Sequence, residues 1–191
     1  MTKFFLSVLL LLLSIPNVMK AQSLEPDFVG EVNLVQGDGA VLLDKEYVKV
    51  KTKAGASLYL VGIGSVKTKI NVEGAHAQAR AGKNEDFSLI VKAVDNQSDP
   101  MSIINIFKFK QYETKRKAEL ASLNTFGGKN DSKLDLVEYT AKKYGESSYQ
   151  ITLKKKAVGE YGIIVRNPNN RDEKNLVVAC FGIDPLHAEE K

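Results

Sequence analysis

Side chains alternate between apolar and polar with a period of two along much of this chain, and this pattern constrains the fold most. In Val48–Lys53 three lysines alternate with valine or threonine, and in Phe107–Lys110 two lysines alternate with two phenylalanines. Such a pattern places one face of a β-strand on a core and the other in water. Clusters of Gly, Asn, Asp and Pro separate these runs, as at 37–39, 95–100 and 127–131. The sequence therefore predicts an all-β protein, an antiparallel β-sandwich, because no spacing suits βαβ units.

The strands that we expect are the runs between these turn signals. They are Phe28–Gln36, Val41–Thr52, Ser57–Gly62, Val66–Val72, Phe87–Val94, Ser102–Lys110, Leu134–Lys142, Tyr149–Leu153, Tyr161–Arg166 and Leu176–Ile183. Residues 111–123 fit two patterns, a strand with alternating charges, or a helix with one face formed by Tyr112, Arg116, Leu120 and Leu123. We favour the strand, because short connections and hairpins dominate on both sides of this stretch.

The first 21 residues have the features of a secretory signal peptide. Lys3 supplies a positive charge, Phe4–Ile15 is an apolar run of 12 residues interrupted only by two serines, and Pro16 follows it. This run is shorter than the roughly 20 residues that a membrane-spanning helix needs. We expect cleavage after Ala21, which also removes two lysines and lowers the formal net charge from +4 to +2. The sequence thus predicts a secreted or periplasmic protein without a membrane span.

Cys180 is the only cysteine in the chain. An intramolecular disulfide is therefore impossible, and we expect no lipid anchor because no cysteine stands directly after Ala21. Cys180 lies in the apolar run Leu176–Phe181, and no histidine or basic cluster adjoins it in the sequence to activate the thiol. We expect a structural thiol packed in the core.

The segment Val158–Ile163 carries the most specific structural signal. Tyr161 begins an apolar strand directly after the turn at Gly159. This resembles the tyrosine corner of immunoglobulin-like and fibronectin-type sandwiches, in which the tyrosine hydroxyl bonds to an upstream backbone group. The resemblance covers about 84–184 and implies that Tyr161–Arg166 and Leu176–Ile183 are the last two strands. The sequence departs from antibody domains in having Ile163 at the position of the second cysteine, and no tryptophan.

The same region is similar to a broad set of secreted bacterial β-sandwich proteins without an assigned activity. The similarity rests on Lys142-Lys143-Tyr144-Gly145, Ser148-Tyr149, Gly159-Glu160-Tyr161 and Cys180-Phe181-Gly182-Ile183-Asp184. It implies an exported all-β protein and no particular chemistry. We divide the chain into a signal peptide (1–21), a β-rich N-terminal region (22–83), an immunoglobulin-like sandwich (84–184) and a flexible tail (185–191). Whether 22–83 forms a separate subdomain stays open at this point.

Residues suited to catalysis are scarce. Only His76 and His187 are available, and we expect an exposed loop position for His76 and a place in the tail for His187. Paired carboxylates for glycoside hydrolysis remain an alternative, because their separation depends on the fold. The outward candidates are Glu31, Glu46, Glu113, Asp135 and Glu138. The oxygen-rich loops at 130–132 and 167–173 could suit calcium, but Asn, Asp and Ser are also what turns require. We therefore expect no metal and no cofactor.

Regularly placed lysines are the candidate binding residues. If the strands around them share one sheet, a basic outer face would contain Lys67, Lys69, Lys108 and Lys110. Such a face could attract anionic glycans, lipid headgroups or nucleic acid. Lysines also protect exposed sheet edges from aggregation without any ligand, and we favour that interpretation. Nucleic acid is not an expected partner, since Phe107 and Phe109 lie on the face opposite to the lysines.

These observations lead to one leading hypothesis and two alternatives. We expect an exported, non-catalytic binding or structural module of the cell envelope, with an unknown protein or glycan as its partner. The first alternative is a secreted carbohydrate-active hydrolase that uses paired carboxylates. The second is a subunit that donates or accepts an edge strand, which would need a long unprotected edge. The lysine-rich strands argue against the second alternative.

Overall fold

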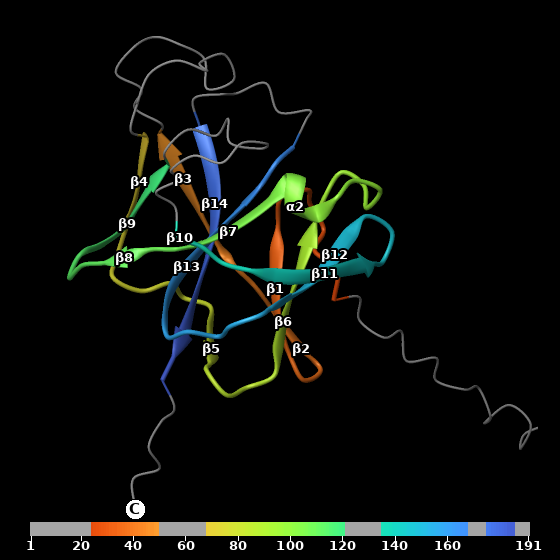
Figure 1. Ribbon diagram of the computed structural model, residues 1–191, viewed down its shortest axis with the longest axis horizontal. Helices are drawn as coiled ribbons and strands as arrows, with labels where there is room; N and C mark the ends of the chain where they lie inside the picture. The colour runs from red at the N-terminus through yellow and green to blue at the C-terminus, as the bar shows by residue number, and fades with distance from the viewer. Residues whose placement is uncertain (1–23, 50–67, 121–134, 168–174, 186–191) are drawn as a thin grey trace, which may run out of the picture.

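The computed structural model describes residues 24–49, 68–120, 135–167 and 175–185, and in them the protein is all-β (Figure 1). The strands are β1 (Val32–Gln36), β2 (Gly39–Leu42), β3 (Asp44–Lys49), β4 (Thr68–Glu73), β5 (Arg80–Gly82), β6 (Phe87–Lys92), β7 (Ile104–Lys108), β8 (Lys110–Gln111), β9 (Lys115–Leu120), β10 (Asp135–Leu136), β11 (Tyr139–Tyr144), β12 (Ser148–Leu153), β13 (Gly159–Val165) and β14 (Asn175–Asp184). A short helix, α2 (Pro100–Ile103), precedes β7. The predicted all-β class with antiparallel sheets is confirmed.

The strands form three sheets. The first has the order β11-β12-β6-β1-β2, the second β10-β7-β13-β14-β3, and the third β4-β9-β8. Neighbours in these orders pair antiparallel, whereas β5 runs parallel to the end of β14. In Figure 1 the third sheet lies on the left, the second in the centre and the first on the right. Each sheet combines strands from before and after residue 83, so the segments 22–83 and 84–184 are interleaved.

The second sheet is the middle layer, because apolar side chains on both of its faces are buried. Tyr161, Ile163 and Phe181 belong to the core shared with the first sheet. Phe107, Ile164 and Cys180 belong to a second core shared with the third sheet. Strands buried on both faces read as continuous apolar runs rather than as alternating ones. The runs Ile163–Val165 and Leu176–Phe181 have this character.

Two predicted strands are in fact divided between sheets. The expected strand Val41–Thr52 bends at Leu43, so that β2 lies in the first sheet and β3 in the second. Leu43 is buried in the core between these sheets, and its amide bonds to the carbonyl oxygen of Val32. The expected strand Leu134–Lys142 is likewise split into β10 and β11. Neither strand alternates strictly through its bend, because two apolar residues adjoin there, Leu42-Leu43 in the first and Leu136-Val137 in the second.

Two local expectations have different outcomes. The described part of 111–123 includes the strand β9, so the strand that we favoured there is confirmed for these residues. The expected strand Ser102–Lys110 begins too early, because residues up to Ile103 belong to α2. Asp99 caps this turn by accepting a hydrogen bond from the amide of Met101, and Pro100 fits the first helical position. The expected strand Ser57–Gly62 lies outside the described residues.

Candidate functional site

The structure places the candidate lysines on different sheets. Lys67 lies outside the described residues. Lys69 is in β4 of the third sheet, opposite Glu119, and Lys110 is in β8 of the same sheet, opposite Lys117. Lys108 is in β7 of the second sheet. The strands that carry these lysines therefore do not share one sheet, which was the condition for a continuous basic face.

Lys108 instead contributes to the turn before β13. Its ammonium donates to the carbonyl oxygen of Val158 over 2.8 Å and lies 6.0 Å from the centre of the Tyr161 ring. Gly159 has a φ of 149°, and a Cβ there would collide with the Lys108 side chain. This turn therefore requires glycine, as its position before the tyrosine suggested.

Tyr161 makes the contact expected of a tyrosine corner. Its ring is buried and stacks on Phe181 with centroids 5.0 Å apart, and its hydroxyl donates to the carbonyl oxygen of Ala157. Burial raises the pKa of the Tyr161 hydroxyl, and the Asp135 carboxylate raises it further, so the hydroxyl remains a donor. Cys180 is fully buried, as expected of a core thiol, and burial raises its pKa to about 12. A thiol in this state is a poor nucleophile.

A buried ionic cluster around Glu160 is the feature that our sequence analysis missed. The Glu160 side chain is 1% exposed. One carboxylate oxygen accepts from Arg80 at 2.9 Å and lies 3.2 Å from Nδ1 of His76. The other accepts from the amide of Ala77 at 2.8 Å and lies 3.8 Å from Arg116. Both oxygens are therefore occupied, and this cluster ties β13 to the segment before β5 and to β9.

The cations of this cluster are held by further contacts. Arg80 also makes two hydrogen bonds to Asp184, of 2.6 and 2.7 Å, and these raise the pKa of its guanidinium. Arg116 is 1% exposed and donates to the carbonyl oxygen of Gly74 at 3.1 Å. Its Nη1 has no hydrogen-bond partner among the described residues. The cluster fixes the position of Glu160 and shields it from solvent, which suits a structural role.

The carboxylates proposed for hydrolysis lie on different elements, and two of them are engaged in ion pairs. Glu31 is buried rather than outward, and it accepts from Lys45 at 2.8 Å. Burial favours its neutral form, but the hydrogen bonds from Lys45 and from the Phe28 amide lower the pKa of Glu31 below its usual value. Glu46, Glu113, Asp135 and Glu138 lie in β3, the β8–β9 turn, β10 and the segment before β11. Glu138 is paired with Lys154 at 3.3 Å.

The remaining site expectations concern histidine and metal. His76 is mostly exposed, as expected, although it also contacts the buried Glu160. His187 and the loop at 130–132 lie outside the described residues, as does 168–174. Among the residues that the structure does describe, no group of three or more His, Cys, Asp or Glu side chains could hold a metal ion.

The N-terminal segment crosses the outer side of the first sheet. Glu25 accepts from the Ser148 hydroxyl at 2.6 Å and pairs with Lys92 at 3.1 Å. Burial would raise the pKa of Glu25, but these contacts and the Ser147 amide lower it instead. The carbonyl oxygen of Leu24 accepts from Asn33 at 3.0 Å. These contacts fasten the segment to β1, β6 and β12, and none of them involves β2.

The strand β2 is the most exposed part of the first sheet. All four of its residues are exposed and uncharged. Its two large side chains, Val41 and Leu42, are 52% and 49% exposed. Among described strands only β1 pairs with β2. The amide of Leu43 bonds to the carbonyl oxygen of Val32. In an antiparallel pair only every second residue bonds to the neighbouring strand, so Val41 bonds to β1 as well. The N–H and C=O groups of Ala40 and Leu42 therefore point away from β1.

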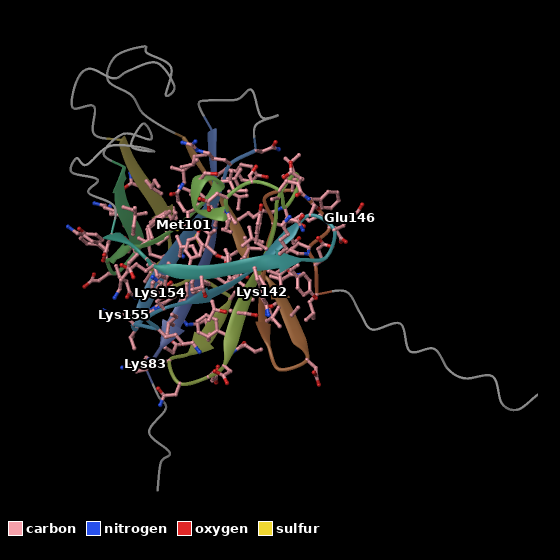
Figure 2. All side chains as sticks on the ribbon, turned by 45° about the vertical axis from the view of Figure 1, so that its right-hand side comes forward. Lys83, Met101, Lys142, Glu146, Lys154 and Lys155 are labelled. Carbon is pink, nitrogen blue, oxygen red and sulfur yellow. The ribbon has the colours of Figure 1, made fainter. Side chains whose placement is uncertain are left out.

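Charged residues distinguish the other described edges from β2. Figure 2 labels Lys142, which belongs to β11, and Lys154, which follows β12. The edge strands carry Lys142 and Lys143 in β11, Asp135 in β10, Lys45 and Glu46 in β3, Glu73 in β4, and Lys110 in β8. Charges at edges prevent unwanted pairing with another strand. The strand β2 lacks this protection, and we take its open edge as the candidate functional site.

Comparisons with known proteins identify no relative of this chain. No family model matches the chain, and neither the curated proteins nor the solved structures contain a match. Within the described residues no helix has both the length and the apolar character needed to cross a membrane.

Proposed function

We propose that this protein is an exported, non-catalytic binding or structural module of the cell envelope, and that it binds through the open edge of β2. The single observation that carries the proposal is an exposed, uncharged edge strand in a molecule whose other described edges carry charges. An edge of this kind binds an extended strand of a partner through backbone hydrogen bonds. This favours a protein partner over a glycan.

The proposal revises the weight that we gave to strand addition. The lysines of Val48–Lys53 argued against an unprotected edge, but they follow the bend at Leu43 and belong to the chain beyond β2. The residues before the bend, Gly39–Leu42, include no charge. The charges of β3 and the open edge of β2 are therefore parts of one expected strand, which in its described part is divided between two sheets.

The state of the carboxylates supports a non-catalytic role. A glycosidase needs two carboxyl groups that flank a scissile bond and exchange protons with it. The buried Glu160 and its neighbour Asp184 both bind the guanidinium of Arg80, and Glu31 is bound by Lys45. Carboxylates held by cations in this way are unsuited to donate a proton.

We expect Leu42→Lys to abolish partner binding, because a lysine on an edge strand opposes the addition of another strand. The measurement is a cross-linked pull-down of tagged residues 22–191 from the cell envelope of the source organism. Leu42 is half-exposed, so the variant should fold, which circular dichroism checks. Thr152→Lys, an exposed position on β12, is the matched control and should retain every partner. Partners that the wild type and both variants capture equally would refute the β2 edge as the binding site.

A further inference from the structure

We infer that the β2 edge binds a second copy of this chain, with the two β2 strands antiparallel around a two-fold axis at Val41. The inference rests on the proposed function, because it names the occupant of the same edge. Pairing of identical surfaces around a two-fold axis is the commonest symmetry of protein dimers. Such a dimer requires an edge that can pair with a second copy of itself, and β2 meets this requirement.

The backbone hydrogen bonds follow directly from the register of β2 on β1. Ala40 and Leu42 present their N–H and C=O groups at the open edge, whereas Val41 uses its groups to pair with Leu34. With the axis at Val41, Ala40 of one copy lies opposite Leu42 of the other. In an antiparallel ladder such residues exchange both of their hydrogen bonds. The two Ala40–Leu42 pairs therefore satisfy all the outward backbone groups of both residues.

The side chains of this arrangement are also compatible. The two Val41 side chains meet across the axis as a pair without hydrogen bonds, the arrangement in which side chains come closest. Each Leu42 lies beside an Ala40, so that a large residue meets a small one. Every side chain of β2 is uncharged, so no like charges meet within the strand. The first sheets of both copies would then form one continuous sheet through β2.

The size of the edge sets the strength of the dimer. The strand β2 has only four residues, because the chain bends into β3 directly after Leu43. An interface of this size is smaller than the ~800 Å² per partner of a standard complex, so the dimer is weak and reversible.

A cysteine at the axis tests the inference. Paired Val41 residues without hydrogen bonds bring their Cα atoms to about 4.5 Å, which suits a disulfide. Under mild oxidation Val41→Cys should form a disulfide-linked dimer about tenfold faster than Tyr47→Cys, because pairing raises the effective concentration of the two thiols. Tyr47 is the matched control, being 75% exposed on β3 and away from the axis. Wild-type protein is the blank, since Cys180 is buried.

The outcomes separate this inference from the proposed function. Adding Leu42→Lys to Val41→Cys should remove the rate advantage if β2 pairs with β2. Equal rates for Val41→Cys and Tyr47→Cys across a concentration series would overturn the second copy as the occupant. If Leu42→Lys still abolishes capture of an envelope protein in that case, the edge binds a different strand. If neither effect is observed, the proposed function fails together with the inference.

Discussion

Glu160→Ala is expected to lower the free energy of unfolding by about 3–5 kcal/mol, the range for removing one partner of a buried ion pair. The loss arises chiefly from what the variant leaves behind. Arg116 is as buried as Glu160, and its positive charge would lose a carboxylate 3.8 Å away. The amide of Ala77 would also lose its acceptor. Urea denaturation followed by circular dichroism measures the change.

Two further variants define the cause of this loss. Glu160→Gln retains an oxygen that can accept from Ala77 but removes the charge, so it should destabilise the protein less than alanine does. Glu138→Ala removes an exposed carboxylate that pairs only across the surface with Lys154, and should change stability by less than about 0.5 kcal/mol. A loss at Glu160 as small as that at Glu138 would show that the cluster does not stabilise the fold.

Phe181→Ala should destabilise the protein by about 3–5 kcal/mol, as is usual for a phenylalanine removed from a core. Phe181 is fully buried between the first and second sheets. Its ring stacks on the ring of Tyr161. It also meets the ring of Phe87 edge-on, and the centroids of these two phenylalanine rings are 6.4 Å apart. Removing it would leave a cavity beside Tyr161 and loosen both sheets at once.

Chemical denaturation also tests this prediction, with Tyr47→Ala as its control. Tyr47 is a large aromatic residue on the edge of the same second sheet, and its side chain is exposed. Its removal should therefore leave the midpoint of unfolding nearly unchanged. If Phe181→Ala and Tyr47→Ala have similar midpoints, Phe181 does not lie in the principal core.

The alternation of side chains was sufficient to predict the all-β class and most of the strands, but not the number of layers. The alternation in Phe107–Lys110 indicated a strand with one face in water. Phe107 in fact faces the third sheet, and Ile104 and Ile106, on the other face of β7, enter the core with the first sheet. A middle sheet is recognisable only where both faces are apolar, as in Ile163–Val165. Lys108 lies on the same face of β7 as Ile106, and its ammonium donates to the carbonyl oxygen of Val158.

The buried ionic cluster could not be predicted from spacing. Arg80, Arg116 and Glu160 are far apart in the sequence, and only the strand order brings them together. One local signal exists, which is a glutamate inside the otherwise apolar strand Gly159–Val165. Because Glu160 and Ile164 lie on the same face of β13, a carboxylate there must be buried and needs cationic partners.

The open edge was hidden for a related reason. Whether a strand lies at an edge depends on the order of the strands, and strand order is not encoded in alternation. The change of sheet at Leu43 separates the uncharged β2 from the charged β3 within one expected strand, Val41–Thr52. A buried leucine at the bend is too common a feature to reveal that change.

Hydrogen exchange at β2, measured by NMR at increasing protein concentration, tests the central claim most directly. The amide of Val41 pairs with β1 and should be protected at every concentration. The amides of Ala40 and Leu42 face the open edge, so they should exchange rapidly in dilute solution and become protected as the edge is occupied. If these two amides exchange at the same rate at every concentration, and also in the presence of envelope extract, the edge binds no strand and the account is contradicted.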